Sequence, residues 1–175
     1  MAFVLEDGTG LSDSNGYQTV ADFVIYHNDR GNSLIDPDTE VQYTDVEIQQ
    51  AIVVASDFVD VKFTFKGIRL LVTQNMEFPR VSAFYDDGAT ILGVPKEIKE
   101  CVSELALKQL SSPIAPDPEW DDSGRYVIKK KDQVEDLIEE REYSNSGVPS
   151  DFRAYPFAEK RLKELIVGGR YLERA

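Results

Sequence analysis

The stretch that decides the fold is Thr44–Val61, TDVEIQQAIVVASDFVDV. It opens with a capping box, because the Thr44 hydroxyl and the Glu47 carboxylate can each accept a hydrogen bond from a backbone N–H at the helix start. Apolar residues then recur at the spacing of one helix face: Ile48, Ala51, Ile52, Ala55, Phe58 and Val59. Val53 and Val54 widen this stripe, and a helix that is apolar over so much of its surface is mostly buried. The pattern predicts a central core helix.

Two further helices are predicted on either side of this stretch. Thr19 and Asp22 form a capping pair before an apolar run that Gly31 ends. Pro95 begins the other helix, whose apolar face is formed by Ile98, Cys101, Val102, Leu105, Ala106 and Leu110. We expect this helix to pack on the central one and to end at Ser111–Pro113.

The segment between these helices has a different character. Residues 61–71 are rich in β-branched and aromatic side chains, which favours an extended chain. Phe78-Pro79-Arg80 excludes a helix around Phe78, and we expect these three residues to fix a wrap over the core from Gly67 to Gly93. Residues 6–16 are predicted to be a loop, and a last short helix is predicted near Phe157–Ile166. The pattern in Arg125–Tyr143 fits a strand or a helix.

Composition limits the classes of protein that remain. A chain of 175 residues with 42% hydrophobic residues fits one folded domain. The net charge is −13, and residues 1–60 contain twelve acidic residues and one basic residue, Arg30. The last 24 residues contain six basic and three acidic residues. One cysteine excludes an internal disulfide. We expect no membrane span and no signal peptide, because no long apolar run occurs.

Enzymatic activity is not predicted. Gly8-Thr9-Gly10 lacks the third glycine of a dinucleotide loop, and the acidic residues 117–121 lack the glycine and glutamate of a calcium loop. We therefore predict no catalytic residue, no cofactor and no metal site. Lys129, Lys130 and Lys131, with Arg125 nearby, could follow phosphates. A solvated charge cluster is the favoured interpretation, because carboxylates follow directly in a chain that is already acidic.

Four separated blocks together resemble a known family. They are Val4–Leu11 with Asn15-Gly16-Tyr17, then Phe65–Arg69, then Gln74–Arg80, and finally Asp87-Gly88 with Val94-Pro95 and the helix through Leu107. In this order they resemble small head-completion proteins of tailed bacteriophages, also called adaptors or head-tail connectors. The family usually has tryptophan before the proline at position 79, and Phe78 replaces it here. Some similar sequences are labelled DnaT-like single-stranded-DNA-binding proteins.

The resemblance implies a mainly α fold: a small helical bundle with an extended β-hairpin arm and a C-terminal helix and tail. Residues 1–112 would form the helical core, 113–150 an acidic linker and the hairpin arm, and 151–175 the C-terminal helix and tail. It implies a structural virion protein that forms a ring of about twelve copies below the portal. The ring would join the head to a tail or nozzle protein, and DNA would pass through its channel without specific binding. The location would be the neck of the virion, after assembly in the host cytoplasm.

The resemblance also implies that the C-terminal segment docks on the portal protein. The candidate anchors are hydrophobic and aromatic residues close to basic ones: Tyr155, Phe157, Leu162, Leu165, Ile166, Tyr171 and Leu172. The other interpretation of these residues is that they complete the core. The alternative function is single-stranded-DNA binding through Arg125, Lys129, Lys130 and Lys131.

Overall fold

The computed structural model describes residues 2–116, 127–133, 138–143 and 155–167. The chain divides into two compact units. The first unit contains Met1–Ile114 and Ala154–Ala175, and the second contains Ala115–Arg153. The described elements are four helices and two small antiparallel sheets, which confirms a mainly helical protein with a small β-hairpin.

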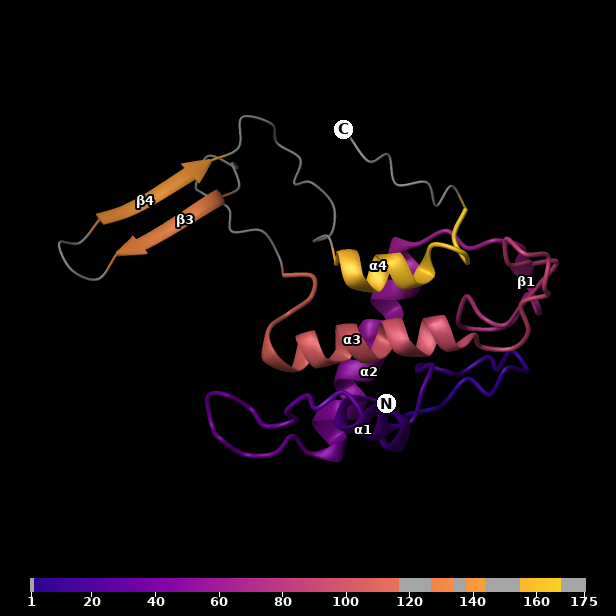
Figure 1. Cartoon of the computed structure of the whole chain (residues 1–175), viewed down its shortest axis with the longest axis horizontal. Coiled ribbons are helices and arrows are strands. Elements are labelled where there is room, and N and C mark those ends of the chain that lie inside the picture. Colours follow the sequence, from indigo (N-terminus) through magenta and orange to yellow (C-terminus); the bar gives the residue numbers. More distant parts are fainter. Residues whose placement is uncertain (1, 117–126, 134–137, 144–154, 168–175) are drawn as a thin grey trace. The chain divides into compact units, whose positions relative to one another are not determined.

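The helices of the first unit surround one hydrophobic core. They are α1 (Val20–Asn28), α2 (Asp45–Lys62), α3 (Lys96–Ser111) and α4 (Pro156–Leu162). Helix α3 packs against all three others, and Figure 1 shows it lying between α4 and α1. The fully buried side chains Ile52, Val59, Ile98 and Leu105 come from α2 and α3, as the sequence pattern predicts.

The helix starts follow from the residues that cap them. The Thr19 hydroxyl accepts a hydrogen bond from the Asp22 N–H, and Thr44 with Glu47 forms the complete capping box. Pro95 is the N-cap of α3 rather than its first helical residue. Helix α2 continues to Lys62, so the prediction of extended chain from residue 61 is wrong by two residues. The helical amide–carbonyl bonds continue there until Phe63, whose N–H still bonds the Val59 carbonyl.

The wrap between α2 and α3 contains a short two-stranded sheet. Strand β1 (Ile68–Arg69) pairs antiparallel with β2 (Arg80–Val81), so that Ile68 lies opposite Val81. The Phe78–Pro79 peptide bond is cis. Gly67 has φ +75°, and a Cβ there would lie 2.4 Å from the Val81 carbonyl oxygen, so no other residue fits at this position.

The segment 155–167 is fixed to the core at several points. The Lys66 N–H bonds the Leu165 carbonyl at 2.8 Å, and the Val167 N–H bonds the Thr64 carbonyl at 2.8 Å. Lys62 and Glu159 form an ion pair at 2.6 Å, with both side chains largely buried. The Tyr155 hydroxyl donates to the Ile114 carbonyl at 2.9 Å. Ile114, which directly precedes the second unit, is therefore bonded to Tyr155, two residues after that unit ends.

The second unit contains the hairpin of β3 (Val127–Gln133) and β4 (Ile138–Tyr143). The strands are antiparallel, with Lys129 opposite Glu142 and Lys131 opposite Glu140. For the described residues 127–133 and 138–143, the choice that the pattern left open is therefore a strand pair and not a helix. Among the described helices, none is both long and apolar enough to cross a membrane.

Candidate functional site: an apolar loop on a polar frame

The most distinctive surface of the described chain is a loop that exposes apolar side chains. We call residues 64–92 the apolar loop. Val72 and Leu92 are 93% and 78% exposed. The other exposed apolar side chains of this loop are Ile68, Leu70, Leu71, Val81 and Phe84. Exposed apolar residues concentrated in one segment are typical of a surface that contacts another molecule.

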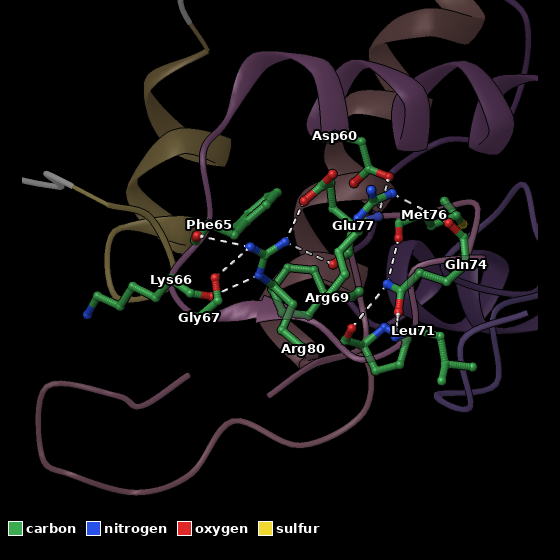
Figure 2. A network of polar contacts seen from close by, with 12 residues as sticks. Asp60, Phe65, Lys66, Gly67, Arg69, Leu71, Gln74, Met76, Glu77 and Arg80 are labelled. Carbon is green, nitrogen blue, oxygen red and sulfur yellow. Dashed lines mark hydrogen bonds and ion pairs between the residues drawn. The ribbon is translucent and has the colours of Figure 1, made fainter. Parts of the chain in front are cut away.

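Arg80 holds the two sides of this loop together, as Figure 2 shows. Its guanidinium donates to the Lys66 and Gly67 carbonyls at 2.8 Å each. It also donates to the Phe65 carbonyl at 3.3 Å and forms an ion pair with Glu77. The fork of N–H groups on an arginine can bond several carbonyls at once, and here it fixes the backbone that precedes β1.

Gln74 performs the same function on the next turn of the loop. Its amide nitrogen donates to the carbonyls of Met76 and Pro79, at 2.7 and 3.1 Å. Its amide oxygen accepts from the Leu71 N–H at 2.9 Å (Figure 2). The side chain is buried, so these bonds are shielded from water. The side chains of Leu71 and Val72 are therefore exposed on a backbone that the buried Gln74 side chain holds in place.

A buried tyrosine and a carboxylate connect this loop to the core. The Tyr17 hydroxyl donates to Asp60 at 2.5 Å and accepts from the Phe78 N–H at 3.2 Å. The second Asp60 oxygen accepts from the Glu77 N–H at 3.0 Å. Burial raises the pKa of Asp60 to about 7, and burial together with the Asp60 charge raises the pKa of Tyr17 well above its ordinary value.

The N-terminal loop is organised by the carboxylate of Glu6. One oxygen accepts from the Gly8 and Gly10 N–H groups, and the other accepts from the Leu11 N–H and the Ser14 hydroxyl, each at 2.9 Å. A Cβ added at Gly10 would lie 3.3 Å from the side chain of Leu71. This loop therefore packs beside the apolar loop and supports it. The sequence prediction of a loop is right, but the role of Glu6 was not predicted.

The single histidine and the single cysteine of the chain are both buried. His27, in the last turn of α1, is fully buried. Its Nε2 contacts the Ser103 carbonyl at 3.1 Å and its Nδ1 contacts the Asn32 amide at 2.9 Å. Burial lowers the pKa of His27, and burial raises the pKa of Cys101 to about 12. Within the described ranges, no cluster of His, Cys, Asp and Glu is placed to hold a metal ion.

The predicted portal anchors lie in different environments. Leu162 and Leu165 are fully buried core residues, because the segment 155–167 is bonded to the chain before β1. Tyr155 and Ile166 are half-buried, and Phe157 is 56% exposed and lies under the Arg161 guanidinium. Tyr171 and Leu172 lie outside the described residues. Portal docking itself stays a prediction.

The residues proposed for nucleic-acid binding lie in the second unit. Lys129, Lys130 and Lys131 are consecutive in β3, and β4 places Glu142, Arg141 and Glu140 opposite them. Arg125 is outside the described residues. Phe78, Pro79 and Arg80 are placed together at the base of the apolar loop, with Phe78 packed edge-on against Tyr17 and Phe65.

These features define a small, mainly helical domain with an apolar loop whose backbone is fixed by polar side chains. The family model described as "Putative DnaT-like ssDNA binding protein" matches residues 1–174, and the chain belongs to this family. No curated protein and no solved structure matches it.

Proposed function

We propose that the chain is a structural subunit that acts by assembly: a head-tail connector of a tailed bacteriophage, forming a ring below the portal. Its partners would be copies of itself, the portal protein and a tail or nozzle protein. Its location would be the neck of the virion. We propose no enzymatic activity. The resemblance of the ordered sequence blocks supports this proposal, and the apolar loop supports it from the structure.

The observation that carries the proposal is that the apolar loop exposes apolar side chains while polar side chains fix its backbone. Leaving Val72 and Leu92 in water is unfavourable, by about 1.5–3 kcal/mol for each side chain that could be buried. Gln74 nevertheless fixes the backbone next to Val72, and the bond from the Ile91 N–H to the Ala83 carbonyl fixes the backbone next to Leu92, while both side chains stay exposed. A surface that is already ordered loses little conformational entropy on association. Such a loop suits a contact between subunits.

The charge distribution supports an assembly that surrounds DNA without binding it. Of the acidic residues in 1–60, Asp22, Asp29, Asp38, Glu40 and Asp45 are exposed on α1, on α2 or between them. Many copies of such a face would repel the phosphates of a duplex passing through a channel. Contacts between the acidic N-terminal part and the basic C-terminal part of a neighbour would weaken at high salt.

The experiment measures self-association by light scattering and analytical ultracentrifugation, with and without portal protein. The double variant V72S/L92S alters only exposed side chains, so it should remain folded and associate at least about tenfold more weakly, a loss of 1.4 kcal/mol. The matched control is Ile25→Ser, which changes an apolar side chain that is 58% exposed on α1. Unchanged association of the double variant would contradict the proposal.

Deleting residues 168–175 tests portal docking without removing the segment that completes the core. The shortened chain should fold and lose affinity for the portal through Tyr171 and Leu172. Phe157→Ser in the full chain tests the exposed part of the same surface. Undiminished binding by both variants would refute this docking assignment.

Single-stranded-DNA binding is the second candidate, and one specific observation favours it: the description of the matched family names this activity. The comparisons support this candidate more than they support the connector. The charge and the register of the hairpin weigh against it, because the chain carries −13 and carboxylates lie opposite Lys129 and Lys131.

Fluorescence anisotropy with a labelled oligothymidine separates the two candidates. If Lys129, Lys130 and Lys131 each neutralise a phosphate, log K should fall with log salt at a slope of about −2. The triple variant K129Q/K130Q/K131Q should then abolish binding. Micromolar binding with this salt slope would replace the connector proposal, and absent binding at low salt would remove the second candidate.

A further inference from the structure

The hairpin of β3 and β4 has two edges with opposite charge. Strand β3 contains Lys129, Lys130 and Lys131 against Asp132, which gives 3 − 1 = +2. Strand β4 contains Glu139, Glu140 and Glu142 against Arg141, which gives 1 − 3 = −2. Among the strands that the structure describes, this sheet has two members, so each strand has one edge without a strand partner.

The register inside the hairpin contains two pairs of opposite charge and two pairs of like charge. Lys129 is opposite Glu142 and Lys131 opposite Glu140, whereas Lys130 is opposite Arg141 and Asp132 opposite Glu139. Like charges directly opposite in an antiparallel pair are destabilising. A two-stranded hairpin is also only marginally stable alone in water. This hairpin is therefore suited to acquiring further strands with a different charge register.

We propose that the free edge of β3 pairs antiparallel with the free edge of β4 in a second copy of this chain. The inference rests on the proposed self-assembly and names the contact that joins neighbours. The register between copies is shifted by two residues relative to the register within the hairpin. Lys131 then lies opposite the partner copy's Glu142, and Asp132 opposite its Arg141, so that no like-charged pair remains in this pairing.

The geometry of this contact leads to a closed ring. Hairpins related by rotation about one axis point the same way, so β3 of one copy runs antiparallel to β4 of the next. The contact joins two different edges and leaves one of each free, which is the head-to-tail arrangement that closes when the rotation permits. The two-residue shift repeats at every contact between copies, and closure of a β-sheet requires such an accumulated register stagger around the ring.

Cysteine cross-linking between full-length chains tests the register. Chains carrying K131C are mixed with chains carrying E142C and oxidised, and covalent dimers are measured on a non-reducing gel. A disulfide requires Cβ atoms about 3.5–4.5 Å apart, so the mixture should give at least about tenfold more dimer than either variant alone. The native Cys101 is fully buried, so it should contribute no background.

The matched control mixes K131C with E140C, which lies opposite Lys131 within the hairpin but is two residues removed in the pairing between copies. It should give little dimer between chains. Circular dichroism checks that each variant keeps the helical content of the natural chain. Equal dimer from both mixtures, or none from K131C with E142C, overturns the inference and shows that the charged edges do not pair in this register.

The outcomes distinguish this inference from the proposed function. Rings seen by light scattering without the K131C–E142C dimer overturn the edge pairing and leave the connector proposal standing. A chain that stays monomeric at millimolar concentration and with portal contradicts both. Specific cross-linking in a chain that also binds single-stranded DNA supports the edge pairing and moves the function to the second candidate.

Discussion

Replacing Arg80 by alanine should destabilise the first unit by opening the base of the apolar loop. The substitution removes the donors that satisfy the carbonyls of Phe65, Lys66, Gly67 and Glu77, together with the ion pair to Glu77. The side chain is only 9% exposed. Breaking a buried hydrogen-bonded charge network costs about 3–5 kcal/mol, and we expect about 3 because water can reach part of this site.

Thermal and urea unfolding followed by circular dichroism measure this loss. A change of 1 kcal/mol shifts Tm by about 2–4 °C for a domain of 150–250 residues, so we expect a decrease of about 6–12 °C for R80A. Arg80→Lys should recover only a small part, because an ammonium group lacks the planar fork of donors.

Arg69→Ala is the matched control, since Arg69 is exposed and lies opposite Arg80 in the β1–β2 pair. It should change the free energy of unfolding by no more than about 0.5 kcal/mol. A loss for R80A below 1 kcal/mol, or equal losses for both variants, would refute the view that Arg80 holds the loop.

Further predictions concern Asp60, Glu6 and Cys101. Because burial raises the pKa of Asp60 to about 7, against about 3.9 in an unfolded chain, its stabilising contribution should be complete below about pH 4 and be lost as the pH rises through 7. The free energy of unfolding of Asp60→Asn should lack this pH dependence. A variant that keeps the pH profile of the natural chain would contradict this role of Asp60. Glu6→Gln replaces an acceptor of the N-terminal loop by a donor and should cost about 2 kcal/mol in urea unfolding; a loss no larger than that of Asp7→Asn, an exposed neighbour, would argue against the role of Glu6. Cys101 should react with a thiol reagent only in denaturant, because its pKa is raised to about 12 and its side chain is buried; fast reaction of the native protein would disprove this packing.

The helical core could be predicted because its signals are local. The capping box at Thr44, the apolar face of α2 and Pro95 before α3 each lie within a few residues of what they determine. The hairpin required the family resemblance, since the apolar pattern of Arg125–Tyr143 fitted two periods equally well. The end of α2 was misplaced because β-branched Val61 is compatible with a helix that is held by tertiary packing.

The polar contacts that fix the apolar loop could not be predicted, because the decisive ones join residues far apart in the sequence. Tyr17 meets Asp60 and Phe78, and nothing in the local sequence around any of the three indicates this pairing. Glu6 offered a weak signal, because it is a carboxylate shortly before two glycines, Gly8 and Gly10, and it accepts hydrogen bonds from their N–H groups. The spacing of Leu162 and Leu165 fitted both docking anchors and core residues. Their burial comes from the packing of α4 on α3 and from the bonds of the following chain to Thr64–Lys66, and such distant contacts leave no signal in the local spacing.

The hydrogen bond from Tyr155 to the Ile114 carbonyl closes the first unit where the chain leaves it for the second unit and returns from it. A segment inserted at such a closed junction can change in length or sequence during evolution while the core keeps its fold. Related proteins could therefore match new neighbours by exchanging this insert alone, and an engineer could graft another hairpin between Ile114 and Tyr155.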